Sequence, residues 1–471
     1  MPARTTPITC CIAALAFAFS TNAQSFEVTD PFDTAASIPP RPTFDSSNPE
    51  VPARPCGALL AGTPIGVIDA VDLALCKNPQ TRELWANARA QAALLGVAQA
   101  AYLPSLDGKL ARSQLSSNSI DTQQRSASLT LSWLLFDFGA RAANLESARQ
   151  LLEAASATLD ATVQTVFLSA LQSYYAAQAT RALLSAAQES EKASRESLSA
   201  AEVRYTVGSG TPADRLQAQT AWSQATLNRI KAEGEVRNSL GTLANVMGLD
   251  ANQPLILADI PAITPDAAFE QNVDALIETA RQRRPDLKSA EAQVKAAQSN
   301  VDYARATGLP TLSLGAGPTW QETGSVSNNS NSIGLTLSLP VFSGFSTTYK
   351  VRNAEALAES KAAQRDRVRL QVALDVWKAY QSLTTAGQSI RTTIDLFNSA
   401  EQSARVALGR YKAGVGNILD VLNAQTALAS ARQQRVQATL DWHVYRATLA
   451  QSIGALDSGL LQAPTAGKKS P

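Results

Sequence analysis

One segment of the 471-residue chain occurs twice, and the two copies are offset by 206 residues. The offset holds along the whole segment, as shown by the pairs Pro79 and Pro285, Pro104 and Pro310, Phe136 and Phe342, Tyr174 and Tyr380, Tyr205 and Tyr411, and Gly248 and Gly454. A constant offset indicates a duplication without a net insertion or deletion. The chain is therefore predicted to contain two equivalent halves, residues 67–250 and 273–456, joined by a proline-containing connector at 251–272.

Each half contains a glycine-bearing break between two helical patterns. The breaks read RYTVGSGT at 204–211 and RYKAGVGN at 410–417. Gly208 and Gly414 suit the left-handed residue that ends a helix, and Thr211 and Asn417 are good N-caps for the helix that follows. An aspartate comes three residues after each cap, as in a capping box. Each break is thus predicted to be the tip of a helical hairpin.

Most of each half is predicted to be helical. The segment 140–205 lacks proline and glycine, and it carries a coiled-coil repeat at Leu145, Leu152, Leu159 and Val166. At 1.5 Å per residue, such a helix would be about 100 Å long. Its counterpart covers 346–411, while the entering helices (71–102 and 273–308) and the returning helices (212–247 and 418–453) are about half as long. Two short helices would therefore lie end to end beside each long one.

Two strand-like segments precede the long helix in each half, on either side of a polar loop predicted at 116–125 and at 321–331. The strand after each loop alternates between apolar and small polar residues. The apolar positions are Ala127, Leu129, Leu131, Trp133 and Leu135 in the first half, and Ile333, Leu335, Leu337, Leu339 and Val341 in the second. The alternation lasts about ten residues, which suits a transmembrane β-strand. A soluble sheet with one buried face would alternate in the same way.

The N-terminal region has the features of an exported protein. Arg4 is followed by an apolar run and small residues, so residues 1–23 are predicted to be a signal peptide. Residues 24–66 are rich in proline and are expected to form extended chain, and 457–471 are expected to form a flexible tail. An oxidising compartment favours a disulfide between Cys56 and Cys76, with two separate buried thiols as the alternative.

Composition argues against several functions. Charged residues make up 17% of the chain and the net charge is +1, so no nucleic-acid partner is expected. The single histidine, His443, and the few cysteines leave little for a metal or cofactor site. The glycine pairs follow helices and precede no Gly-Lys-Ser/Thr, so they are not phosphate loops, and the chain is not predicted to be an enzyme. After residue 23 no apolar run reaches 18 residues, so any membrane span would have to use strands.

The duplicated halves, the two strands in each half and the paired tips together resemble the TolC-like outer-membrane factors. The resemblance covers nearly the whole mature chain. It implies a mainly α-helical homotrimer in the cell outer membrane, in which four strands per subunit contribute to a twelve-stranded transmembrane β-barrel. The long coiled-coil hairpins would form a tunnel extending into the periplasm. The strand count agrees with oligomerisation, because four strands cannot close a barrel and open edges are not tolerated in lipid.

The same resemblance implies roles for residues at the tips. The glycines match the small residues at which a periplasmic adaptor docks: Gly208, Gly210, Gly414 and Gly416. Asp420 matches an aspartate that lines the constriction, and Asp214 and Tyr411 match a pair that links the closed gate. Gly416 stands where a gate arginine can occur, and Asn423 replaces a second ring aspartate, so a more loosely held gate is expected. Helix termination and capping remain the alternative explanation for the glycines and aspartates.

The implied function is that of an exit duct that works with an adaptor and an inner-membrane transporter. Because no lipid-attachment cysteine follows the signal peptide, type I protein (toxin) secretion is the leading hypothesis. Drug or metal efflux is the alternative. A periplasmic coiled-coil scaffold is a lesser alternative, since it would not need four alternating strands.

Overall fold

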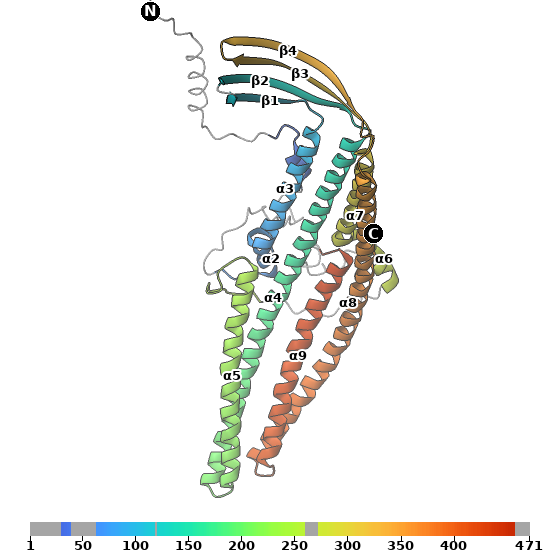
Figure 1. Ribbon diagram of the computed structural model, residues 1–471. Helices are drawn as coiled ribbons and strands as arrows, with labels where there is room; N and C mark the ends of the chain where they lie inside the picture. Colours follow the sequence, from blue (N-terminus) through green and yellow to red (C-terminus); the bar gives the residue numbers. More distant parts are fainter. Residues whose placement is uncertain (1–29, 39–62, 118–119, 260–271, 457–471) are drawn as a thin grey trace, which may run out of the picture.

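The computed structural model describes residues 30–38, 63–117, 120–259 and 272–456 as an elongated subunit, with strands at one end and helical tips at the other (Figure 1). The strands are β1 (Ser105–Ser117), β2 (Ile120–Phe136), β3 (Thr311–Thr323) and β4 (Val326–Ser338). They form one antiparallel sheet in the order β1-β2-β3-β4. The predicted signal peptide and C-terminal tail lie outside the described residues.

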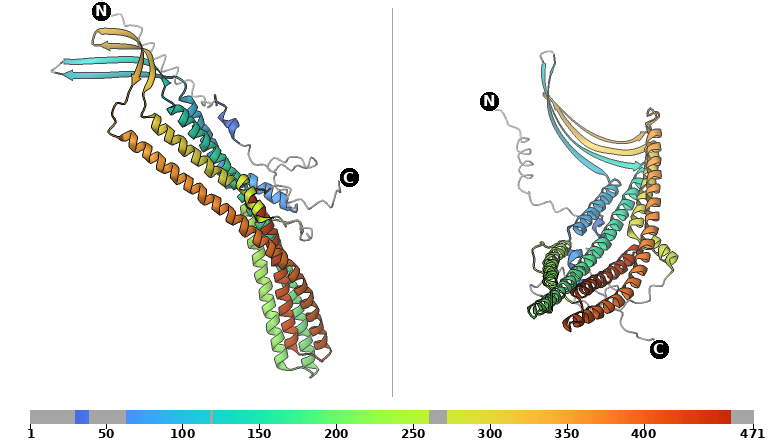
Figure 2. Two further views of the ribbon diagram at one scale, coloured as in Figure 1. Left: turned by 90° about the vertical axis from the view of Figure 1, so that its right-hand side faces the viewer. Right: turned by 90° about the horizontal axis from the view of Figure 1, so that it is seen from below.

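Two long helices run through the molecule, as predicted. They are α4 (Ala140–Thr206) and α8 (Ser346–Lys412), each of 67 residues and therefore about 100 Å long. The shorter helices α3 (Pro79–Ala100) and α5 (Pro212–Val246) lie end to end beside α4, and α7 (Pro285–Ala306) and α9 (Ile418–Ile453) do so beside α8. Because α4 also contacts α7 and α9, the helices form one curved layer (Figure 2).

The prediction of one continuous entering helix in each half was wrong. The first entering segment is divided into α2 (Val67–Lys77) and α3, and the second into α6 (Val273–Arg283) and α7. The residue before each proline is extended, with ψ 129° at Asn78 and 122° at Arg284. A residue before proline avoids the helical region because its backbone clashes with the proline ring. Each proline then begins a new helix at its first position.

The two long polar loops were also wrongly predicted, because the strands continue into the polar residues. Arg112 pairs with Arg125 in the first hairpin, and Thr323 pairs with Val326 in the second. Backbone hydrogen bonds hold an antiparallel ladder together whatever the polarity of its side chains. Gly324, with φ 62°, supplies the positive dihedral that the tight second turn needs.

The register of the four strands gives the sheet two chemically different faces. Directly paired residues lie on the same face; the apolar face carries Leu106 and Leu110, Leu129, Leu131 and Trp133, Leu312, Leu314, Ala316 and Trp320, and Ile333, Leu335 and Leu337. The opposite face is mostly serine, threonine and glycine. Within the described ranges, no helix packs across either face (Figure 1).

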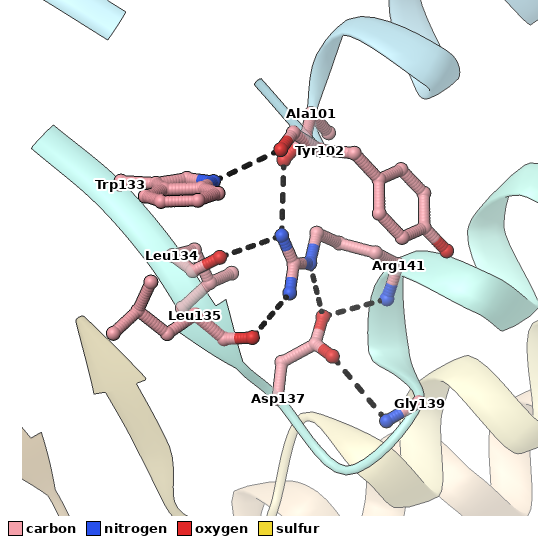
Figure 3. A network of polar contacts seen from close by, with 8 residues as sticks. All are labelled: Ala101, Tyr102, Trp133, Leu134, Leu135, Asp137, Gly139 and Arg141. Atoms are coloured by element: carbon pink, nitrogen blue, oxygen red, sulfur yellow. Dashed lines mark hydrogen bonds and ion pairs between the residues drawn. The ribbon is translucent and has the colours of Figure 1, made fainter. Parts of the chain in front are cut away.

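A polar network fixes the sheet to the helices where β2 turns into α4 (Figure 3). The Arg141 guanidinium donates to the carbonyl oxygens of Leu134 (2.7 Å) and Leu135 (3.2 Å), and its Nε pairs with the Asp137 carboxylate at 3.1 Å. Asp137 also accepts the backbone N–H of Gly139. Both charged side chains are largely buried. The network therefore satisfies the backbone groups left free at the strand end.

Part of the connector packs against the middle of the helical layer, beside Tyr174 of α4. Ile65 forms a parallel bridge with Leu257, and the Tyr174 hydroxyl lies 3.1 Å from the carbonyl oxygens of Ile65 and Ala258. Tyr174 is buried, and burial raises the pKa of its hydroxyl. This tyrosine joins the segments that come just before and just after the first half.

The described part of the proline-rich segment departs from the extended chain that was predicted. Residues Thr34–Ser37 form a short 3-10 helix, η1, which packs against α3. The Asp30 carboxylate accepts the backbone N–H of Ala35 at 2.8 Å, which stabilises this turn. Cys76, in α2, is disulfide-bonded. Cys56 lies outside the described residues, so the Cys56–Cys76 pairing stays a prediction.

Candidate gate and docking site at the helical tips

The first hairpin tip is built on backbone hydrogen bonds to the end of α4. The backbone N–H groups of Ser209 and Gly210 both donate to the Arg204 carbonyl oxygen at 2.9 Å. Gly208 has φ 74°, a conformation that side chains rarely adopt. A Cβ on Gly210 would lie 3.1 Å from Arg204 and Tyr205 backbone atoms, so this glycine permits a close approach.

The second tip repeats these features. Gly414 has φ 84°, the Val415 backbone N–H donates to the Arg410 carbonyl oxygen at 3.0 Å, and a Cβ on Gly416 would lie 2.9 Å from the Tyr411 backbone nitrogen. Helix termination thus accounts for all four glycines. A Cβ on Gly414 would meet no atom within 4 Å. The surface there is open to a partner.

The two caps differ from each other. Thr211 and Asp214 form the predicted capping box, with the Thr211 Oγ1 accepting the Asp214 N–H at 3.2 Å and the Asp214 carboxylate accepting the Thr211 N–H at 3.1 Å. In the second tip, the Asn417 side chain accepts the Leu419 N–H at 3.1 Å. Asp420 takes no part in this cap, so the capping-box expectation was wrong there. The Asn417 side chain reaches the second helical residue, one position short of Asp420.

Tyr411 is buried between the two hairpins, and Arg204 covers it. The Arg204 guanidinium carbon lies 4.6 Å from the centre of the Tyr411 ring, and its Nη1 donates to the Tyr411 carbonyl oxygen at 3.0 Å. Burial raises the pKa of the Tyr411 hydroxyl; the Arg204 charge opposes this effect and the Asp214 charge adds to it. Asp214 is therefore near, yet the hydroxyl has no hydrogen-bond partner among the described residues.

Further polar links join the hairpins, and sequence reasoning did not find them. The Gln425 side chain donates to the Ser197 hydroxyl at 2.8 Å. Lys412 pairs with Glu196, and Arg432 pairs with Glu189 at 3.0 Å. An apolar cluster lies beside these links, made of Ala201, Ala218, Tyr411, Ile418 and Val421. No sequence signal marks such pairs, because they depend on how the two hairpins are placed.

Asp420 is exposed and lines an open groove between α8 and α9. The groove has a volume of about 670 Å³, and its wall includes Arg410, Gly416 and Asn423. Asp420, the predicted constriction residue, thus lies beside Gly416 and Asn423, the two positions at which this chain differs from the gate of the family it resembles. The structure places the Asp214 charge near the buried Tyr411 hydroxyl without a hydrogen bond between them, and it leaves Asp420 apart from them in the α8–α9 groove.

The remaining chemistry of the described residues is sparse. In the part of the chain that the structure describes, no group of three or more His, Cys, Asp or Glu side chains is placed to hold a metal ion. None of the described helices has both the length and the apolarity that a membrane-crossing helix requires.

Comparison with known proteins agrees with this architecture. The family model described as outer membrane efflux protein matches residues 70–249 and 276–455. Protein CyaE of Bordetella pertussis is 34% identical over 381 residues, which cover 79% of this chain and 80% of CyaE. The alkaline protease secretion protein AprF of Pseudomonas aeruginosa is 25% identical over 419 residues, covering 84% of this chain and 86% of AprF.

Solved structures show the same fold. The outer-membrane channel OprN matches with a TM-score of 0.74 at 21% identity, covering 83% of this chain and 90% of OprN. The open state of the Neisseria gonorrhoeae MtrE outer membrane channel matches with a TM-score of 0.71 at 20% identity, covering 83% of this chain and 89% of MtrE. The chain therefore belongs to the outer membrane efflux protein family and is an outer-membrane protein.

Proposed function

We propose that the chain forms a homotrimeric channel-tunnel in the outer membrane and acts as the exit duct of a tripartite export machine. The observation that carries the proposal is the bare four-stranded sheet, which has one apolar face and one face of small polar residues. An apolar face of this size is unfavourable in water. A strand pair with apolar residues toward lipid and polar residues toward a lumen is the arrangement of membrane barrels.

The height of the apolar band supports this assignment. In β3 it extends from Leu312 to Trp320, which is roughly 26 Å at 3.3 Å per residue and less when the strand is tilted. The hydrocarbon-facing band of an outer-membrane barrel is about 25 Å tall. Polar residues, including Arg112 and Arg125, lie beyond it toward the strand turn. The polar ends of the strands would then project outside the cell.

Exposed aromatic residues mark the opposite border of the band. Phe136 and Phe138 make an edge-to-face pair with ring centres 4.8 Å apart, and Phe342 and Phe345 make a second pair at 5.6 Å. All four residues are at least 50% exposed in the subunit. Aromatic side chains favour the boundary between lipid and water. These four phenylalanines would lie at the periplasmic surface of the membrane.

The open edges of the sheet indicate how the subunits assemble. In this subunit β1 and β4 are the edge strands. Lipid does not tolerate unpaired backbone groups, so each edge needs a partner. A second copy can supply one by pairing its β1 with β4, and three copies give the twelve strands that the resemblance implies. The apolar residues Leu370, Leu374 and Trp377, exposed on one face of α8, would be covered in the same assembly.

The tips are the proposed adaptor site. A groove of about 560 Å³ runs along α4 between α5 and α9, and small residues such as Ala186, Ala193 and Ala429 line it. Small side chains allow a partner helix to approach closely. The exposed turns at Gly208 and Gly414 lie at the same end. A periplasmic adaptor hairpin would dock here and connect the duct to an inner-membrane transporter.

Asp420 is the proposed constriction residue. Its carboxylate is exposed, and no described residue forms an ion pair with it. Three copies brought close to one axis would create a negative ring that attracts cations. Asn423, one turn further along α9, also lines the groove and would not add charge. The tunnel would thus be cation-selective with a single carboxylate ring.

Protein secretion is the proposed cargo class, because AprF is named for secretion of alkaline protease and aligns along most of this chain. Drug or metal efflux is the second candidate, which the family description favours. Deletion of the gene separates the two. Loss of a secreted protein with unchanged drug and metal tolerance supports secretion, whereas the opposite pattern supports efflux.

Single-channel recording in planar bilayers tests the duct itself. The purified protein should insert as a trimer and conduct with cation preference. Asp420→Ala should weaken that preference, and Asn423→Asp should strengthen it by adding a second ring one turn away. A protein that forms no trimers and no channels would overturn the proposal, and unchanged selectivity in both variants would remove Asp420 from the constriction.

A further inference from the structure

The contact between the two tips within one subunit uses one face of the first hairpin and a different face of the second. From the first hairpin, Arg204 covers the Tyr411 ring and donates to its carbonyl oxygen. From the second, Gln425 donates to the Ser197 hydroxyl. The two hairpins are copies of one another, so each also has the face that the other one uses.

The 206-residue offset carries both contacts onto residues of the same type. Arg204 and Tyr411 correspond to Arg410 and Tyr205, and Ser197 and Gln425 correspond to Ser403 and Gln219. In the subunit all four corresponding residues are exposed. The Arg410 side chain forms no hydrogen bond or ion pair with the described residues. The second pair of faces thus carries the same residue types, but these residues do not contact one another within the subunit.

The shape of the surface agrees with this correspondence. In the first hairpin, Ala201 and Ala218 are buried in a cluster with the Tyr411 side chain. Their counterparts Ala407 and Ala424 line the open groove of about 670 Å³ between α8 and α9, together with Ser403 and Arg410. The open groove is therefore the counterpart of the one that Tyr411 fills, and a tyrosine side chain fits it.

Tyr205 of the same chain is on the far side of the tip from this groove. At the tips α5 and α8 form opposite edges of the helical layer (Figure 1). Tyr205 lies at the α4–α5 end, and its ring is covered by Arg215, whose guanidinium carbon is 5.0 Å from the ring centre. A second copy of the chain can bring its own Tyr205 to the groove.

We propose that neighbouring subunits join at the tips by the same contact that joins the two hairpins within each subunit. Tyr205 of one copy enters the α8–α9 groove of the next, where Arg410 covers its ring and Ser403 accepts a hydrogen bond from Gln219. This inference rests on the proposed trimer. It gives the closed tip six similar contacts, three within subunits and three between them.

The contacts between subunits lack the ion pairs found within subunits. Lys412 and Glu196 correspond to Thr206 and Gln402, which carry no charge. Arg432 and Glu189 correspond to Thr226 and Asp395, which cannot form an ion pair either. The three contacts between subunits are therefore the weaker set, and the tip opens along them.

Disulfide trapping tests the contact directly. Ser403→Cys combined with Gln219→Cys should, after oxidation of the trimer, link the chains into a covalent trimer on a non-reducing denaturing gel. The matched pair Ser197→Cys with Gln425→Cys should lose its free thiols equally well but stay monomeric. Each single cysteine variant controls for random collision. The oxidised Ser403→Cys/Gln219→Cys channel should conduct less than the reduced one.

The outcomes separate this inference from the proposed function. If trimers are present by native mass spectrometry but the Ser403→Cys/Gln219→Cys chains remain monomeric, the tip contact is wrong and the duct stands. Ladders longer than a trimer would also contradict the closed contact. If native mass spectrometry shows no trimers, both proposals fall.

Discussion

The Arg204 guanidinium lies against the ring of Tyr411, 207 residues further along the chain, and donates a 3.0 Å hydrogen bond to its carbonyl oxygen. Its Nη2 also donates to the Ser209 carbonyl oxygen of its own tip at 3.2 Å. One side chain thus holds its own turn and the neighbouring helix end. Together with the links from Gln425, Lys412 and Arg432, this contact sets the relative position of the two hairpins.

Arg204→Ala should loosen the two tips. It removes a cation–π contact and two charge-assisted hydrogen bonds, for which we expect a loss of about 1–2 kcal/mol in the free energy of unfolding. Single-channel conductance should rise, because the hairpins separate more readily. Arg405→Ala is the matched control, since Arg405 is 73% exposed and, among the described residues, forms an ion pair only with Glu401 on its own helix. Equal conductance in the two variants would contradict the role of Arg204.

Tyr411→Phe should leave the tip closed. The buried hydroxyl has no partner among the described residues, so its removal costs nothing and even relieves an unsatisfied polar group. Tyr411→Ala should instead cost about 3–5 kcal/mol, as expected for loss of a buried aromatic ring. Thermal melting of the trimer in detergent compares the two. A strongly destabilised Tyr411→Phe would show that the hydroxyl has a partner in the assembled trimer.

Arg141→Ala should weaken the attachment of the sheet to α4. The side chain is 13% exposed, and its removal leaves the Asp137 carboxylate buried without its cation, which costs about 3 kcal/mol or more. The yield of heat-stable trimers in the outer membrane should fall. Thr347→Ala, at the corresponding position of the second half, removes a 3.3 Å hydrogen bond with Ser343 and no ion pair among the described residues, and it should assemble normally. Similar losses from both variants would contradict the asymmetry between the halves.

The sequence was sufficient for the parts of the fold that depend on local pattern. The 140–205 prediction differs from α4 by one residue, because this run contains no glycine or proline, the residues that disfavour a helix most strongly. The strand ends were missed, since polar residues such as Asn328 and Asn331 pair through the backbone in β4. Polarity alone indicated a loop there.

The candidate site was predictable only at the level of its turns. The capping box at Thr211 and the positive φ values at Gly208 and Gly414 follow from residue type. The contact between Arg204 and Tyr411 does not follow from residue type, because predicting it requires knowing which faces of the two hairpins meet. The repeat itself contains that information only after one of the two contacts has been seen.

Acid should destabilise the packing of α9 on the middle of α4 by protonating His443. This side chain stacks on Tyr175 with ring centres 4.5 Å apart and lies against Trp442. Burial, with a further contribution from the Arg446 charge, lowers the pKa of His443 to about 4, below its ordinary value of 6.5. The unfolded chain therefore binds the proton more readily, so this contribution to stability is complete above pH 6.5 and is lost as the pH falls toward 4.

Thermal melting of the wild-type trimer and of His443→Phe between pH 7.5 and 4.5 measures this effect. The ring of phenylalanine keeps the stack on Tyr175 and cannot bind the proton. The difference in melting temperature between the two proteins should shift in favour of the variant as the pH falls. A difference that does not change with pH would show that His443 is not buried in the assembled protein.

The position of the two ends relative to the membrane is the central claim, and labelling of single cysteines in intact cells tests it most directly. Ser325→Cys places a thiol in the β3–β4 turn, and Val415→Cys places one in the exposed second tip. A membrane-impermeant maleimide should label Ser325→Cys on intact cells and should label Val415→Cys only after the outer membrane is permeabilised. Labelling of Val415→Cys on intact cells, with Ser325→Cys protected until permeabilisation, would contradict an outer-membrane sheet with periplasmic tips.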